Sequence, residues 1–282
     1  MNTNRCSILQ LIFVELKSLF YNIYTWISLS LYAAFASAAC FSEGFRDSHV
    51  GNILDNNIYI TLTNQHMLFF LIVSLIVVFS PMFAADKKIG MEELGDTCFY
   101  GKQKRKLSKV IASVIYMLCI ILIFEGITLL LCIISNNDLR LGKTVFEFMK
   151  PTIILTSGQY YFFSFAMIVM GAMFVVLLTL FVSHKSKDSL VPFASIALFC
   201  GIEAFFYFVY EQLYLWNLNV FRLLAPYSLL FDNKVPFSPA TRVLVIITLL
   251  SIILSSILAW LTIRGAKKCT YKRGIFTSKI IS

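Results

Sequence analysis

The sequence predicts an all-helical, polytopic membrane protein whose chain crosses the bilayer six times. Of the 282 residues, 59% are hydrophobic and only 14% are charged, and the mean hydropathy is +0.79. This composition leaves too little polar surface to cover a water-soluble domain of 32.1 kDa. The apolar residues form long runs instead of the alternating pattern of a membrane β-barrel, so we expect the spans to be helices.

Six stretches reach the length of about 20 residues that a helix needs to cross about 30 Å of hydrocarbon. We expect the spans at residues 19–41, 67–85, 110–134, 159–182, 190–214 and 243–263. The apolar residues just before the first span, from Ile8 to Lys17, form either an interfacial helix on the inner surface or an extension of that span. The last outer connection, residues 215–242, contains three prolines and is expected to fold back against the protein as a re-entrant-like loop.

The distribution of lysine and arginine predicts that both termini are cytoplasmic. The two termini and the connections on their side hold 17 of the 24 basic residues, and the opposite side holds 7. Basic residues concentrate on the cytoplasmic side of membrane proteins. The net charge of +9 is therefore explained by topology, and we expect the lipid bilayer, and no nucleic acid, to be the partner of these charges.

Catalytic chemistry is poorly represented in the chain. The tripeptide Gly142-Lys143-Thr144 lacks the first glycine of a phosphate-binding loop, because residue 137 is asparagine. The three histidines lie in connections and form no zinc-binding pair on a helix. The seven cysteines include no C-x-x-C pair and are interpreted as membrane-packing residues or thiols. We therefore expect no catalytic residues, no metal site and no cofactor in this chain.

Three acidic residues lie inside the expected spans, namely Glu125 in the third and Glu203 and Glu211 in the fifth. A charge at mid-membrane costs about 2.5 to 3.5 kcal/mol on insertion scales, so each is expected to face protein, water or a partner, or to be protonated. They are the candidates for a translocation pathway. The alternative for Glu125 and Glu203 is a structural hydrogen bond to a neighbouring helix, and Glu211 lies close enough to the outer end to reach the interface.

The connection between the second and third spans, residues 86–109, carries the most informative pattern. An acid directly after the span is followed by a glycine, a short segment of mixed apolar and acidic residues, a second glycine, and a basic run that leads into the third span. This pattern, with six spans and both ends inside, resembles the type-2 permeases of ABC transporters. The resemblance is one of architecture over nearly the whole chain, and it departs from the family where Asp86 replaces an expected glutamate.

The resemblance implies that this connection carries a coupling helix that docks in a cleft of a separate ATPase subunit. The residues it assigns to coupling are Asp86, Gly90, Glu92, Glu93, Leu94, Thr97, Phe99 and Gly101. A short helix with apolar side chains can transmit a rigid-body movement to the spans on either side of it. The alternative is an ordinary solvated loop whose lysines only fix the topology.

The resemblance further implies a permease subunit of an ATP-driven exporter in a cell membrane, expected to be a bacterial plasma membrane. Its partners would be two copies of a cytoplasmic ATP-binding subunit, which bind ATP and Mg, and a second permease copy or a related permease chain. The substrate class stays open, with an antimicrobial or other peptide preferred. The alternatives are a non-transporting membrane sensor or assembly factor and, third, a membrane hydrolase.

Overall fold

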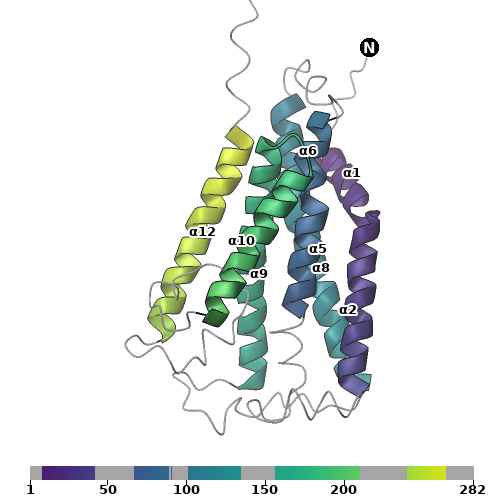
Figure 1. The fold of residues 1–282 in the computed structure, drawn as a ribbon, viewed down its shortest axis with the longest axis vertical. Helices are drawn as coiled ribbons and strands as arrows, with labels where there is room; N and C mark the ends of the chain where they lie inside the picture. Colours follow the sequence, from purple (N-terminus) through teal and green to yellow (C-terminus); the bar gives the residue numbers. More distant parts are fainter. Residues whose placement is uncertain are drawn as a thin grey trace, which may run out of the picture.

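The structure is a computed structural model that describes residues 8–41, 67–88, 90, 101–134, 156–209 and 240–264, without the side chains of residues 101, 102, 157, 160, 203–209 and 240–244. Within these ranges the chain forms a bundle of helices (Figure 1). In chain order they are α1 (Ile8–Phe20), α2 (Ile23–Phe41), α5 (Leu68–Phe79), α6 (Pro81–Lys88), α8 (Gly101–Ile134), α9 (Ser157–Lys185), α10 (Leu190–Val209) and α12 (Ala240–Arg264).

The described chain confirms the prediction of an all-helical protein with multiple membrane-spanning helices. Five helical stretches are long and apolar enough to cross a bilayer: Ile23–Phe41, Leu68–Lys88, Gln103–Ile134, Tyr161–Lys185 and Val245–Arg264. The expected fifth span, residues 190–214, begins with α10, whose apolar part with described side chains, Leu190–Ile202, is shorter than a span. The outer connection 215–242 lies outside the described residues except for the first turn of α12, so its predicted re-entrant form stays a prediction.

Helix α9 occupies the centre of the bundle and packs against α5, α6, α8, α10 and α12. On one side of it, α8 packs along α1 and α2, and on the other side α12 packs mainly against α9 and to a lesser extent against α8 (Figure 1). The main core contains large buried side chains such as Tyr32, Phe79 and Tyr116. Helix α8 has 34 residues and is therefore about 50 Å long, more than a bilayer core requires.

The burial pattern of α12 is the reverse of that in a water-soluble helix. Three of the four buried positions among its described side chains are polar, namely Ser251, Ser255 and Thr262, and the fourth is Ile247, whereas Ile253 and Trp260 are about half exposed. A helix in water would turn its isoleucines inward, but in lipid, apolar side chains lose nothing by facing outward and small polar residues favour close helix packing. The pattern therefore supports a lipid environment for this helix.

The helix boundaries differ from the expected spans at the charged end. Helix α8 begins nine residues before the expected third span, so the basic run from Lys102 to Lys109 is helical. The second span breaks at Ser80 into α5 and α6. At the first span, a break at Tyr21 and Asn22 separates α1 from α2, and Asn22 Oδ1 accepts a hydrogen bond from the Tyr24 N–H at 3.1 Å. Residues 8–17 are thus part of a separate helix and not an extension of the first span.

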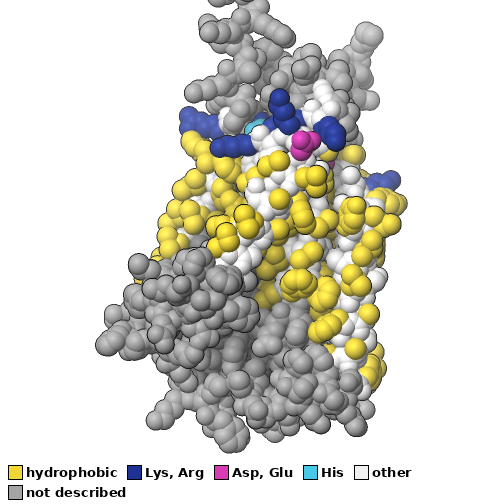
Figure 2. Space-filling model, in the orientation of Figure 1, with side chains coloured by type: hydrophobic (Ala, Val, Ile, Leu, Met, Phe, Trp, Pro, Cys, Tyr) yellow, Lys and Arg dark blue, Asp and Glu magenta, His cyan; other side chains and the backbone are white. Residues whose placement is uncertain are grey.

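Charged side chains gather at one end of the bundle. Figure 2 shows basic side chains and an acidic one at the end where α6 and α12 finish and α8 begins, above an apolar belt. Among the described side chains, Glu125 is the one charged group inside the body of the bundle, and it is 7% exposed. Helix α1 lies at the same end, where Leu9 and Phe13 are exposed while Leu19 is buried, as expected for an interfacial helix.

Candidate functional site

The short helix α6, at the charged end, begins at a proline and is supported by a serine of α9. Pro81 has no N–H to donate, so the helical hydrogen-bond ladder is interrupted there, although Ser80 keeps helical backbone angles and donates to the Ile76 carbonyl. The hydroxyl of Ser183, on α9, accepts hydrogen bonds from the N–H groups of Phe83 and Ala84 at 3.1 and 3.2 Å and donates to the Ser80 carbonyl at 2.7 Å. One buried serine therefore supplies partners for backbone groups at the start of α6, which is how a proline break is tolerated in a membrane helix.

The last turn of α6 is joined to α8 by Asp86. Its Oδ2 accepts a hydrogen bond from Lys109 Nζ at 2.7 Å and lies 3.1 Å from Arg105 Nη2. The side chain of Lys109 is 5% exposed, whereas those of Asp86 and Arg105 are 24% and 30% exposed. Lys109 also donates to the Met82 carbonyl at 2.6 Å and lies 5.4 Å from the Phe83 ring. The buried ammonium is thus held by groups at both ends of α6.

A second basic cluster joins α6 and α8 to the end of α9. Lys106 Nζ lies 3.1 Å from His184 Nε2, and Lys87 Nζ donates to the His184 carbonyl. Lys106 is 5% exposed, and the His184 ring packs edge-on against Phe83 with ring centroids 5.5 Å apart. The C-terminal end of a helix carries partial negative charge on its carbonyls, so lysines there are favourably placed. The charged ends of α6, α8 and α9 are therefore linked by side chains.

Helix α1 adds an acidic group to this cluster. Burial raises the pKa of Glu15 above its ordinary value of 4.5, while the positive charge of Lys109 lowers it and the charge of Asp86 raises it. Glu15 therefore interacts electrostatically with Lys109 and Asp86, the two charged residues that join α6 to α8. We call the set of Glu15, Asp86, Arg105 and Lys109 the charged-end cluster.

The structure gives Gly90 a defined backbone role at the end of α6. Its φ is +73°, in the left-handed region, and its N–H donates to the Lys87 carbonyl at 3.2 Å. A glycine in this conformation just beyond the last helical residue is a common helix terminator. No atom lies within 4 Å of an added Cβ, so the requirement is for the backbone angle and not for space.

The remaining coupling candidates are not brought into this cluster by the described chain. Gly101 is the first residue of α8. Glu92, Glu93, Leu94, Thr97 and Phe99 lie outside the described residues.

Of the three acids proposed for the pathway, the structure describes the side chain of Glu125 alone. Glu125 is buried in α8, one helical turn from Thr128, whose hydroxyl shares a hydrogen bond with the Tyr32 hydroxyl of α2. Glu203 lies in α10 with a side chain outside the description, and Glu211 lies outside the described residues. For Glu125 the placement favours the structural alternative, since its neighbourhood is a packed helix pair.

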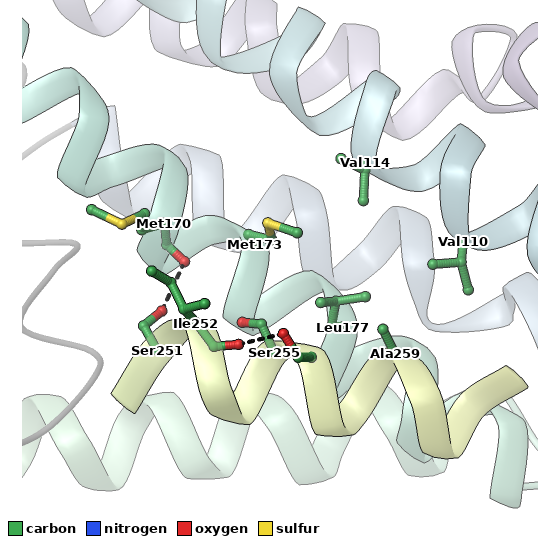
Figure 3. Close-up of a pocket in the computed structure, with 10 residues that line it drawn as sticks. Val110, Val114, Met170, Met173, Leu177, Ser251, Ile252, Ser255 and Ala259 are labelled. Atoms are coloured by element: carbon green, nitrogen blue, oxygen red, sulfur yellow. Dashed lines mark hydrogen bonds between the residues drawn. The ribbon is translucent and has the colours of Figure 1, made fainter. Parts of the chain in front are cut away.

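A half-open hollow of about 220 Å³ lies between α8, α9 and α12 (Figure 3). Its walls are mainly apolar and include Val110, Met173 and Ala259, with Ser251 and Ser255 on α12. The Ser251 hydroxyl donates to the Met170 carbonyl at 3.4 Å. The hollow is large enough for a short apolar group, and Glu125 is not part of its lining.

Sequence reasoning missed most of the residues that build the charged end. Arg105, Lys106 and Lys109 were interpreted as topology signals, and Pro81 and Ser183 carried no local pattern. A signal was present in the helical spacing of Lys106, Lys109 and Ser113, which continues the buried face of α8 formed by Ala112, Tyr116 and Ile120. Within the described residues no three His, Cys, Asp or Glu side chains are placed to hold a metal ion.

Comparison with protein-family models and with curated protein sequences finds no match to this chain.

Proposed function

We propose that this chain is the membrane-spanning permease subunit of an ATP-driven exporter, and that residues 89–100 contact a separate ATPase subunit. The main observation that supports the proposal is that side-chain and backbone contacts fix the helices at both ends of this segment. Gly90 ends α6 in a fixed turn, Asp86 pairs α6 with the first turns of α8, and Ser183 joins α6 to α9. A solvated loop that only sets topology needs no such bracing.

The charge distribution supports a cytoplasmic position for this segment. The described Lys and Arg side chains lie at the end of the bundle from which residues 89–100 leave and to which they return. By the positive-inside rule this end faces the cytoplasm, where an ATPase has access to ATP and Mg. The proposed assembly contains two such ATPase subunits and a second permease copy or a related chain, in a bacterial plasma membrane.

Transport would follow from movement of α6, α8 and α9 as a linked group. ATP-driven closure of the two ATPases would push on residues 89–100, and the side-chain links would pass that displacement to the helices. The chain itself performs no chemistry in this proposal. A non-transporting sensor or assembly factor is the alternative, and a membrane hydrolase is the third possibility.

The test is to purify the affinity-tagged chain from its native membranes and to measure ATP hydrolysis that orthovanadate inhibits, with the co-purifying subunits identified by mass spectrometry. We expect a subunit with a nucleotide-binding motif and vanadate-sensitive hydrolysis. Leu94→Asp and Phe99→Asp should release this subunit, because a charge in an apolar groove is poorly compensated. Lys187→Asp, at an exposed position in another connection, is the matched control and should retain it.

Two outcomes would contradict the proposal. Absence of ATP hydrolysis in the purified assembly would leave the sensor or assembly factor as the better description. Retention of the ATPase by both Asp variants, at the level of the Lys187→Asp control, would remove residues 89–100 from the contact.

For the substrate we propose a cationic amphipathic peptide, supported by the position of Glu203 among aromatic residues of the fifth expected span. Glu203→Gln should then lower export of a cationic peptide more than of a matched neutral peptide, with a smaller effect of Glu211→Gln. Equal losses for both peptides, with less protein in the membrane, would assign Glu203 a structural role.

A further inference from the structure

The hollow between α8, α9 and α12 lies in the half of the bundle nearer the charged end. On α8 its lining is Val110 and Val114, in the first half of the helix, and on α12 its lining runs from Ser251 to Ala259. This stretch of α12 extends about 12 Å along the helix axis, and α12 ends shortly beyond it at Arg264. The hydrocarbon of one leaflet is about 15 Å thick, so the hollow lies mainly within the leaflet at the charged end.

The surface of the hollow suits hydrocarbon better than water. Figure 3 shows valines of α8 and serines of α12 on opposite walls, with Met173 and Leu177 of α9 between them. The Ser256 hydroxyl donates to a carbonyl of its own helix at 2.7 Å, and the Ser251 hydroxyl donates to a carbonyl of α9 at 3.4 Å. A buried water needs about two to four polar partners, and hydroxyls that already bond to the backbone supply few of them.

The hollow is large enough for a segment of acyl chain and is continuous with the lipid-facing surface. Its volume is about 220 Å³, and an apolar cavity of roughly 150 Å³ is enough to bind benzene. Ile252 is part of the lining and is also 54% exposed. Because α12 packs less against α8 than against α9, a chain from the surrounding bilayer can enter beside Ile252.

Each of the three helices carries a basic residue just beyond the hollow, toward the charged end. Lys106 lies on α8 one turn before the lining, Lys185 on α9 two turns beyond it, and Arg264 on α12 between one and two turns beyond it. The cations of Lys185 and Arg264 are each 4.4 Å from a ring centroid one turn earlier on their own helices, at Phe181 and Trp260. These contacts turn both cations back toward the level of the hollow.

The depth of these cations matches that of a lipid phosphate. Along their helices the three basic residues lie about 6–12 Å from the lining. The headgroup region of each leaflet is about 5–8 Å thick. A lipid whose acyl chain occupies the hollow would therefore present its phosphate to these basic residues.

We infer that the hollow binds an acyl chain of an anionic phospholipid from the cytoplasmic leaflet, and that Lys185 and Arg264 interact with its phosphate. Basic pockets between membrane helices on the cytoplasmic side suit anionic headgroups. The choice of leaflet rests on the orientation indicated by the charges, and not on the proposed ATPase contact. A cationic peptide is a poor occupant, because the same basic residues would repel it. The bound lipid would fill the space between α8 and α12.

The test uses the full chain purified in dodecyl maltoside and given equal concentrations of phosphatidylglycerol and phosphatidylcholine with the same acyl chains. Native mass spectrometry then measures how much of each lipid stays bound. We expect one phosphatidylglycerol to be retained in preference to phosphatidylcholine. Excess inorganic phosphate should not displace it, because burial of the acyl chain contributes to its affinity.

The role of the basic residues is tested by neutralising them. The double variant Lys185→Gln with Arg264→Gln should bind phosphatidylglycerol about tenfold less, because each basic residue near an anionic surface contributes roughly a factor of five in affinity. The matched control is Lys17→Gln, which removes an exposed lysine of α1 on the other side of the bundle (Figure 1). This control should retain the lipid.

The role of the hollow is tested by filling it. Ala259→Phe and Val114→Phe add a ring from opposite walls, and each should lower retention of both lipids by about tenfold, the effect of losing about two buried methylene groups. Ile253→Phe, at a half-exposed position of α12 outside the lining, is the matched control and should retain the lipid. Because the two filling variants lie on different helices, a folding defect in one leaves the other as a test.

Three results would overturn the inference. Equal retention of the two lipids by the unmodified chain would remove the role of the basic residues. Displacement by inorganic phosphate would assign these residues to a free anion. Retention by both filling variants at the level of Ile253→Phe would place the acyl chain outside the hollow. None of these measurements involves ATP hydrolysis or transport, so the inference and the proposed function fail separately.

Discussion

The pairing of Asp86 with Lys109 should stabilise the protein by an amount that a double-mutant cycle can measure. The two charges are 2.7 Å apart, and at an effective dielectric constant of about 20 the Coulomb energy of such a contact is about 6 kcal/mol before desolvation is subtracted. Removing one partner of a fully buried pair costs about 3–5 kcal/mol. Because Asp86 is a quarter exposed, and exposed pairs contribute far less, we expect about 2 kcal/mol for Asp86→Asn.

Two features of the site set the size of the coupling. Lys109 keeps the Met82 carbonyl at 2.6 Å when Asp86 is neutralised, so its ammonium does not become fully uncompensated. Lys109→Met removes the buried charge and replaces it with an apolar chain that fits the same space, so the double variant should recover part of the loss. We expect a coupling energy between Asp86 and Lys109 of about 1–2 kcal/mol.

The assay is reversible unfolding in mixed micelles of dodecyl sulfate and dodecyl maltoside, with the free energy of unfolding measured for both single variants and the double variant. Lys104→Met is the matched control, because Lys104 is on the same helix but exposed. Its combination with Asp86→Asn should be additive to within about 0.5 kcal/mol. A coupling to Lys109 no larger than this control would show that the contact does not hold α6 to α8.

Three further changes test the neighbouring elements. Ser183→Ala should cost about 1–3 kcal/mol of unfolding free energy in the same micelles, because it removes the partner of two backbone N–H groups, whereas Thr179→Val, at a buried hydroxyl bonded within its own helix, should cost clearly less. Gly90→Ala should cost about 1 kcal/mol through its positive φ, and Gly90→Asn less; equal costs would argue against a left-handed turn. Because burial raises the pKa of Glu15 above 4.5, the folded protein binds this proton more tightly than the unfolded chain, and its stability should fall as pH rises from 4.5 through the raised pKa. Glu15→Gln should abolish this part of the pH dependence and leave stability below pH 4.5 unchanged; an unchanged slope would contradict the burial of the carboxyl group.

The spans were predictable because lipid imposes a simple requirement of length and apolarity. The expected third span ends at residue 134, as α8 does, and the expected fourth and sixth spans differ from α9 and α12 by at most three residues at each end. Each helix must meet this requirement of length and apolarity by itself, so a span can be recognised from its own stretch of sequence.

The charged end was less predictable because its contacts join distant parts of the chain. Ser183 meets the backbone of α6 across about 100 residues, and no local spacing indicates such a contact. Lys106 and Lys109 were interpreted only as topology signals, because lysine is seldom buried without a partner, but Asp86, His184 and the Met82 carbonyl supply partners. The basic run is consequently helical and packed.

The proline break and the side-chain links together determine how a force on residues 89–100 would spread. Pro81 separates α6 from α5. The ion pair of Asp86 with Lys109 links α6 to α8, and the hydrogen bonds of Ser183 link the start of α6 to α9. A displacement would therefore reach α8 and α9 through side-chain contacts, whereas the backbone hydrogen bonds between α5 and α6 are interrupted at Pro81. Further along the bundle, the hydrogen bond between Tyr32 and Thr128 holds α2 to α8. Movement of α8 at the charged end should thus carry α2 with it, and the junction at Ser80 is where α6 can change its angle to α5.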